Sequence, residues 1–390
     1  MFKAYKYRLY PTDPQKELIT KHIGSSRFVY NLALETKNTA YLGSKHNYSQ
    51  FDLIKQLPEL KKGCEWLKEV NSQSLQQSIQ NMDTAFKLFF KGAGFPKFKS
   101  KHRGNKSFSV PQNVIVDNNL LIIPKFKEGI NIVLHRELKG ILKSATVSVT
   151  PTGKYFVSIL CETGETNIPK QKIKEETTIG VDLGIKDFAI TSDGEVFPNP
   201  KYLRKAQSKL KYVQSKYSKN KGKKIKQKLT KLHEKVTNKR KDFLHKVSSK
   251  LVRENQTICL ENLNVSGMIK NHNLAQAISD VSWTTFVNML EYKAEWYGTN
   301  ILKIGRFAPS SKTCSNCGNI NKELTLKDRE WTCKACHSHH DRDINAAINI
   351  KSFALKNNLS GTDRKNHDEL PTLVGVMTHE AHPIGYAVGG

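Results

Sequence analysis

The chain has 390 residues, of which 63 are Lys or Arg and 35 are Asp or Glu, and its formal net charge is +28. A chain this basic repels itself unless a polyanion supplies counter-charge, so we expect nucleic acid as its partner. The sequence has no run of about 18 apolar residues and no apolar signal-peptide core, which excludes a membrane span and predicts an intracellular protein with reduced thiols.

The first 163 residues change from a strand pattern to a helical pattern and back again. Residues 2–10 alternate as a strand does, and Thr12 then offers a helix N-cap. Apolar residues at helical spacing run from 18 to 34 and from 67 to 90. Short strand patterns follow from about 110 to 163. The sequence therefore predicts one small barrel that is interrupted by a helical insertion.

Basic and aromatic residues alternate in the segment that follows the predicted helices. Such a segment could track a nucleic-acid backbone and stack on bases. A loop packed by its own phenylalanines explains the composition equally well. The basic residues are Lys97, Lys99, Lys101, Arg103 and Lys106, and the aromatic ones are Phe95, Phe98 and Phe108.

A third unit begins at residue 177 with two strand patterns and continues into a strongly basic stretch. Residues 201–250 hold 19 Lys and Arg but only two acids, and so contribute +17 to the net charge. Apolar residues at intervals of three and four predict two amphipathic helices with a break near residues 220–222. A solvated helical hairpin is the plain alternative, but solvation alone would not require one sign of charge. Lys223 and Lys224, just beyond the break, are candidate contacts for nucleic acid.

Four of the seven cysteines have the spacing of zinc ligands. Cys314 and Cys317 form one pair, and Cys333 and Cys336 form a second pair after fifteen residues. Two such pairs are typical of a tetrahedral structural zinc site, and redox chemistry is the weaker alternative. A nearby histidine could replace Cys336 as the fourth ligand. The candidates are His337, His339 and His340.

Three acids lie where a metal-dependent nuclease of the RNase H type would need them. Asp182 and Glu261 each close a predicted strand, and Asp343 begins a predicted helix. Three converging carboxylates need cations to offset their repulsion. Two Mg²⁺ ions, or Mn²⁺ in their place, could activate water and stabilise the leaving oxygen of a phosphodiester. An Asp at a strand end more often forms a turn, so only the set of three carries the prediction.

Motifs spread over residues 1 to 350 together resemble the TnpB family, transposon-encoded proteins related to type V CRISPR effectors. The resemblance implies an α/β multidomain fold. It comprises a wedge β-barrel, a helical recognition insert, and an RNase H-like (RuvC) nuclease domain that contains an inserted zinc ribbon. The motifs are Arg8–Thr12, Ser26–Asn31, Gly94–Phe98, Val181–Phe188, Asp242–Lys246, Glu261–Leu263, Leu290–Gly298 and the cysteine ribbon followed by His340–Ala347.

The resemblance also implies boundaries for these parts. The barrel would comprise residues 1–10 and 110–170, and the insert residues 11–109. The nuclease domain would comprise residues 176–308 and 341–352, and the ribbon, which would bind target nucleic acid, residues 309–340. Residues 353–390 are expected to form a disordered tail, because their glycines accompany no helical or strand period.

The implied function is RNA-guided DNA cleavage by a monomer bound to RNA in the cytoplasm of a prokaryote, near its nucleoid. A guide RNA from the transposon end would pair with double-stranded target DNA beside a short motif. The family pattern assigns Asp182, Glu261 and Asp343, rather than Asp341, to the single catalytic site. The helical insert would read the motif, with Tyr48 and the stretch from Asn71 to Gln76 in the comparable region.

Two other functions compete with RNA-guided cleavage. The same three acids could serve a transposase that cuts and joins transposon ends, although a zinc ribbon inside the nuclease domain favours the guided enzyme. A guided DNA-binding repressor with a dead active site is the other alternative, and the three intact acids argue against it.

Overall fold

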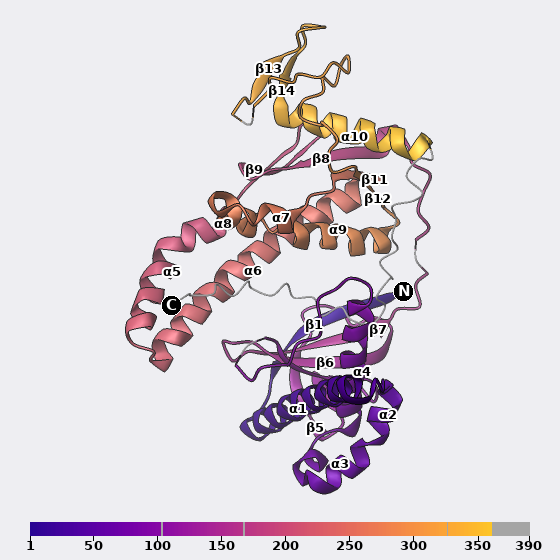
Figure 1. Ribbon diagram of the computed structural model, residues 1–390, viewed down its shortest axis with the longest axis vertical. Helices are drawn as coiled ribbons and strands as arrows, with labels where there is room; N and C mark the ends of the chain where they lie inside the picture. The colour runs from indigo at the N-terminus through magenta and orange to yellow at the C-terminus, as the bar shows by residue number, and fades with distance from the viewer. Residues whose placement is uncertain (103, 167, 326, 361–390) are drawn as a thin grey trace. The chain divides into compact units, whose positions relative to one another are not determined.

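The computed structural model describes residues 1–102, 104–166, 168–325 and 327–360, which form two compact units (Figure 1). The first unit is Met1–Glu165, and the second begins at Thr166. Within the described residues, no helix is both long and apolar enough to cross a membrane.

The first unit contains an antiparallel sheet of seven strands in the order β2-β6-β7-β1-β5-β4-β3. Alternate side chains of β1 point into its core, among them Tyr5, Tyr7 and Leu9. The sheet therefore joins the first strand of the chain to the later strands, as the sequence predicts. The strands are β1 (Phe2–Tyr10), β2 (Lys106–Val110), β3 (Ile115–Asp117), β4 (Leu120–Ile123), β5 (Phe126–Val133), β6 (Ile141–Val149) and β7 (Tyr155–Glu162).

Strand β2 departs from the sequence prediction, which places its residues in the basic and aromatic segment. Phe108 is 3% exposed in the core of the sheet. Phe95 and Phe98 are about half exposed, and the Phe95 ring meets Phe86 edge-on. Phe108 is therefore a core residue of the sheet, whereas the rings of Phe95 and Phe98 in the preceding segment are exposed.

Helices occupy the chain between β1 and β2, and their start is the predicted one. Thr12 caps α1, since its backbone N–H donates to Gln15 Oε1 (3.0 Å) and its hydroxyl accepts from the Gln15 N–H. The second helical stripe was expected to be continuous, but it breaks before Asn71, which caps α4. The elements are α1 (Asp13–Ser44), α2 (Gln50–Lys55), α3 (Leu57–Gly63), the 3₁₀ helix η1 (Glu65–Glu69) and α4 (Ser72–Phe89).

The second unit is built on a mixed sheet of five strands in the order β10-β9-β8-β11-β12. Strands β8, β9 and β10 are antiparallel, whereas β11 and β12 continue the sheet parallel to β8. The strands are β8 (Thr178–Leu183), β9 (Asp187–Thr191), β10 (Val196–Pro198), β11 (Thr257–Glu261) and β12 (Asn300–Ile304).

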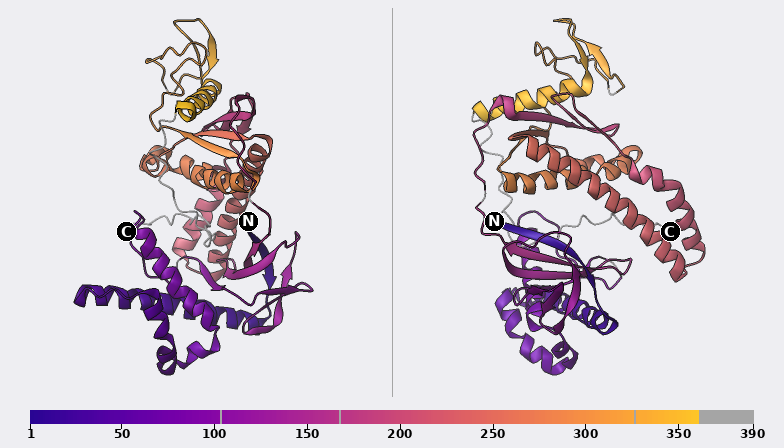
Figure 2. Two further views of the ribbon diagram at one scale, coloured as in Figure 1. Left: turned by 90° about the vertical axis from the view of Figure 1, so that its right-hand side faces the viewer. Right: turned by 180° about the vertical axis from the view of Figure 1, so that it is seen from behind.

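Helices cover both faces of this sheet. Helices α6 and α9 pack on the face that holds Ile179, Val181, Ile258 and Leu260. Helix α10, yellow in Figures 1 and 2, lies on the opposite face. The helices are α5 (Tyr202–Lys219), α6 (Lys223–Glu254), α7 (Val265–Met268), α8 (His272–Val281), α9 (Trp283–Tyr297) and α10 (Arg342–Ser360), and two short strands, β13 (Glu330–Thr332) and β14 (His339–Asp341), pair before α10.

The two basic helices form as predicted, with the break at residues 220–222. Helices α5 and α6 pack against each other along Leu210, Val213 and Val236, which are buried. Asp280 stabilises the start of α5, because its carboxylate accepts the backbone N–H of Leu203 at 3.1 Å. The lysines consequently lie on the outer surface of this hairpin.

The beginning of the expected tail is part of a helix. Helix α10 continues to Ser360, so residues 353–360 are helical. Phe353 and Ala354 pack against a small core with Cys259 and Ile304, which supplies the burial that extends the helix. The rest of the expected tail, residues 361–390, lies outside the described residues.

Candidate active site and zinc ribbon

Asp182 and Glu261 lie at the same level on two neighbouring parallel strands. The register of β8 with β11 pairs Val181 with Leu260, and the two acids are the next residues of these strands. Because side chains alternate along a strand, the two carboxylates share a face with Gly180 and not with Val181. That face is the one covered by α10.

Gly180 allows α10 to lie directly on β8. A Cβ atom at Gly180 would come within 2.0 Å of the Ala347 carbonyl oxygen. Asp343 lies one helical turn before Ala347, a rise of about 6 Å, which matches the two strand residues from Gly180 to Asp182. The first turn of α10 therefore reaches the end of the strand where Asp182 and Glu261 lie.

The negative charges of Glu261 and Asp343 act on the Asp182 carboxyl group. Loss of hydration raises the pKa of Asp182 to about 8, and the negative charges of Glu261 and Asp343 act in the same direction. The guanidinium of Arg342 acts in the opposite direction. Carboxylate oxygens are the ligands that Mg²⁺ and Mn²⁺ prefer, so the chemistry of these three side chains suits a divalent cation, although both oxygens of Asp343 are paired with arginines here.

Asp341 and Asp343 have different roles at the start of α10. Asp341 Oδ1 accepts the backbone N–H groups of Asp343 and Ile344, each at 2.9 Å, and so caps the helix. The Asp343 carboxylate instead pairs with Arg342 (2.9 Å) and with Arg329 of the ribbon (3.1 Å). Sequence reasoning missed both arginines, because nothing in their spacing marks them.

Two buried asparagines fasten α10 to the start of the ribbon. Asn345 is 1% exposed, donates to the Thr313 carbonyl at 2.8 Å and accepts the Ser315 N–H at 2.9 Å. Asn349 donates to the carbonyls of Ser310 and Thr313. The helix that carries Asp343 and the first cysteine pair are thus held together by hydrogen bonds.

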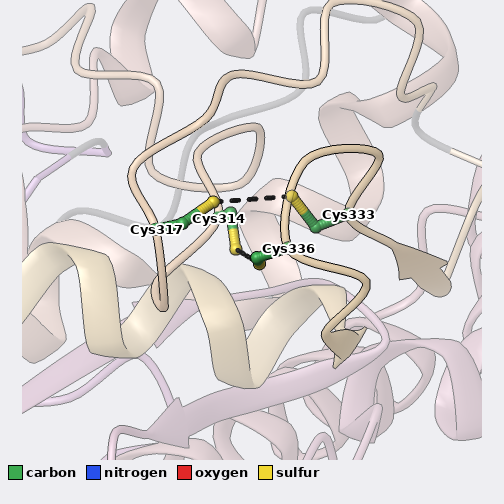
Figure 3. Close-up of side chains that lie close together, drawn as sticks. All are labelled: Cys314, Cys317, Cys333 and Cys336. Carbon is green, nitrogen blue, oxygen red and sulfur yellow. Dashed lines mark hydrogen bonds between the residues drawn. The ribbon is translucent and has the colours of Figure 1, made fainter.

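The four predicted cysteines meet in one cluster (Figure 3). Their sulfur atoms all lie within 4.8 Å of one another. The Sγ atoms of Cys314 and Cys336 are 3.6 Å apart, as are those of Cys317 and Cys333. The cluster fits a structural zinc ion with four thiolate ligands. Cys336 belongs to it, while His340 Nε2 lies 3.0 Å from Cys314 Sγ.

We expect Cys314→Ser to release the zinc and unfold the ribbon, because a structural site contributes its binding energy to folding. Zinc analysis should fall from about one ion per chain to a small fraction of that. Cys64→Ser, in the first unit, is the matched control and should retain the zinc. Full zinc occupancy in Cys314→Ser would contradict the assignment of this cysteine as a ligand.

The candidate contacts in the helical region have different surroundings. Tyr48 is partly exposed and its ring packs on His46, with the centroids 4.4 Å apart. Asn71 is 7% exposed and caps α4, while its backbone N–H donates to the buried His22. Gln76 is partly exposed on α4. Of these residues, Asn71 already has a structural role.

The basic candidates are mostly exposed. Lys97, Lys223 and Lys224 face solvent. The ammonium of Lys99 lies 3.9 Å from the Tyr30 ring centre, and loss of hydration lowers the pKa of Lys99 to about 8. Arg103 lies outside the described residues.

Comparisons with known proteins identify the family. Three family models match: "Helix-turn-helix domain" of the OrfB IS605 group over residues 1–45, "Probable transposase" over residues 158–272, and "Cas12f1-like, TNB domain" over residues 283–350. A Streptomyces pristinaespiralis protein named "Putative RNA-guided DNA endonuclease" is 40% identical, with 90% of this chain and 89% of the relative covered. Relatives named TnpB-like also match. The chain belongs to the TnpB family.

Other similarities agree with this placement. The Escherichia coli (strain K12) relative named "Putative RNA-guided DNA endonuclease InsQ" is 32% identical, with 89% of this TnpB-family chain and 91% of the relative covered. The Cas12f1 protein solved in a complex with sgRNA and target DNA has a TM-score of 0.57 at 13% identity, with 90% and 98% of the two chains covered. The two proteins share a Cas12-like α/β fold.

Proposed function

We propose that this TnpB-family chain is an RNA-guided DNA endonuclease of a transposable element, with one divalent-metal site for phosphodiester hydrolysis. The observation that carries the proposal is the register of β8 with β11, which sets Asp182 beside Glu261 under the first turn of α10. The names of its relatives support RNA guidance.

The residues of the site would divide the work between them. Asp182, Glu261 and Asp343 would hold the cations, and two Mg²⁺ or Mn²⁺ ions bound there would activate water and stabilise the leaving oxygen. Arg342 and Arg329 place positive charge beside Asp343, which limits repulsion among the acids. The zinc ribbon would keep the start of α10 in position, because Asn345 and Asn349 join the two.

The parts of the chain would have separate tasks. The five-stranded sheet is the core of the proposed RuvC-like domain (176–308 and 341–352), and the ribbon (309–340) would contact target nucleic acid. Residues 1–10 and 110–170 would form the wedge β-barrel and residues 11–109 the recognition insert. The seven-stranded sheet and the helices between β1 and β2 support a barrel with a helical insert, although β2 (Lys106–Val110) belongs to the sheet.

Binding of guide RNA and DNA would rest chiefly on positive charge. The α5–α6 hairpin presents its lysines, Lys223 and Lys224 among them, to solvent. The segment with Lys97 and the exposed Phe95 and Phe98 could contact bases or backbone. We propose that Tyr48 and Gln76 take part in reading the motif beside the target. Affinity should fall steeply as salt concentration rises.

A direct transposase is the second candidate function, and one match favours it. The model that covers residues 158–272 is described as "Probable transposase". An inactive repressor is the less favoured alternative, because all three acids are present in the chain and the charges of Glu261 and Asp343 act on Asp182.

Sequencing the bound RNA distinguishes the proposed RNA-guided endonuclease from a direct transposase. The protein, expressed from its native locus, should co-purify with RNA from the transposon end, because the basic hairpin needs a polyanion. The complex should cut a plasmid that matches the guide, in the presence of Mg²⁺, and leave a plasmid with a scrambled match intact. RNA-free protein that still cut transposon ends would reject guided cleavage in favour of the transposase.

A further inference from the structure

A buried hydroxyl reaches the active site from the segment between β12 and the first cysteine pair. Ser310 is 3% exposed, and its Oγ donates a hydrogen bond to Oε1 of Glu261. Ser310 lies four residues before Cys314. One side chain therefore joins the backbone that leads into the zinc ribbon to a carboxylate at the end of β11.

The backbone around Ser310 is itself fixed. Its carbonyl oxygen accepts from Asn349 Nδ2 at 2.8 Å, and its N–H donates to the Ala308 carbonyl at 2.8 Å. Asn349 is 3% exposed and also donates to the Thr313 carbonyl at 2.6 Å. The main chain of Ser310 is therefore held from α10, and its hydroxyl donates to Glu261.

The carboxylates of Glu261 and Asp343 thus accept hydrogen bonds from different kinds of donor. Both oxygens of Asp343 accept from guanidinium groups, whose positive charge would compete with a cation. The Ser310 hydroxyl is neutral, so it can fix Oε1 of Glu261 without competing for charge. The orientation of Oε2 follows from that of Oε1, because the carboxylate is planar.

We propose that Ser310 is a positioning residue that fixes the Glu261 carboxylate for divalent-cation binding and links the metal site to the zinc ribbon. The inference rests on the proposed function, in which Glu261 holds a cation. Hydrogen-bond partners of metal ligands typically contribute about 10- to 100-fold to metal affinity or activity. The same bond makes the geometry of the active site depend on an intact ribbon.

The test is a Mn²⁺ titration of the full-length, RNA-bound protein, followed by the electron paramagnetic resonance of free Mn²⁺. The variants are Ser310→Ala, Ser310→Thr, Ser311→Ala and Glu261→Gln. The Asp182→Ala complex measures the background of Mn²⁺ that is bound by the RNA. Ser310→Ala should weaken the site by about 10- to 100-fold while the zinc content stays at that of the wild type. Ser310→Thr keeps the hydroxyl and should restore most of the affinity. Ser311→Ala, at the partly exposed neighbour, should bind as the wild type does.

Two results would overturn the inference, and they differ from failure of the proposed function. Wild-type Mn²⁺ affinity in Ser310→Ala, with weakened binding in Glu261→Gln, would show a metal site that does not need the hydroxyl. Loss of zinc from Ser310→Ala would show that Ser310 only holds the ribbon together. Unchanged binding in Glu261→Gln itself would instead reject the proposed metal site.

Discussion

Replacing Asp182 with alanine should abolish DNA cleavage while RNA and DNA binding stay nearly unchanged. Asp182 is central to the proposed site, since it lies beside Glu261 and within the electrostatic reach of Asp343. Without it, too few carboxylates remain to hold the cations that activate water. We expect cleavage of a matched plasmid to fall by at least about 10³-fold, which corresponds to about 4 kcal/mol in the barrier.

Binding must be measured in the same preparations to interpret this loss. The amount of co-purified RNA and the affinity for matched DNA should equal those of the wild type, because the basic hairpin is untouched. Asp193→Ala, which removes an exposed acid from the turn between β9 and β10, is the matched control and should cut normally. Cutting by Asp182→Ala at the wild-type rate would reject the site assignment.

Replacing Gly180 with alanine should both destabilise the second unit and stop cleavage. The new Cβ would lie 2.0 Å from the Ala347 carbonyl oxygen and 2.9 Å from the Lys351 nitrogen, so α10 would have to move. Overpacking of a core typically costs about 1–3 kcal/mol, and close contact with two backbone atoms of α10 places this substitution at the upper end of that range. Displacing α10 also moves Asp343 away from Asp182.

Thermal unfolding and plasmid cleavage, measured on the same RNA-bound protein, check this prediction. We expect the melting temperature to fall by about 5–10 °C. Gly305→Ala is the matched control, because a Cβ at Gly305 has no neighbour within 4 Å, and it should behave as the wild type. Wild-type stability in Gly180→Ala would mean that α10 does not rest on β8.

The sequence predicted elements well where periodicity and termination signals agree. Strand β1 has the expected bounds, β11 ends at the expected Glu261, and the capping residue of α1 is the expected Thr12. The break between the basic helices follows from the glycine at position 222. These features depend on local chemistry, which a single sequence displays directly.

The missed elements depend on partners that are distant in the sequence. Strand β2 exists because Phe108 and Val110 fill the core beside β6, and its lysine obscured the alternation. The helical stripe breaks at Asn71 because the backbone there bonds to His22. Helix α10 runs past the expected end because Ala354 is buried against Cys259.

The residues of the candidate site also fall into those that the sequence predicts and those that it does not. Acids at strand ends and cysteines in pairs are visible in the sequence. The structure gathers the four cysteines into one cluster and places Asp182 level with Glu261 on the neighbouring strand. Their supporting residues are not visible, because Gly180, Ser310 and Arg342 acquire their roles only through contacts across the fold.

Asp343 lies at the start of the last described helix, so it is synthesised after the other two acids. During translation, Asp182, Glu261 and the basic hairpin leave the ribosome well before α10 does. A nascent or prematurely terminated polypeptide that ends before residue 342 would therefore carry the basic hairpin without Asp343. Under the proposed function, such an unfinished chain would lack one of the three acids that cleavage of DNA requires.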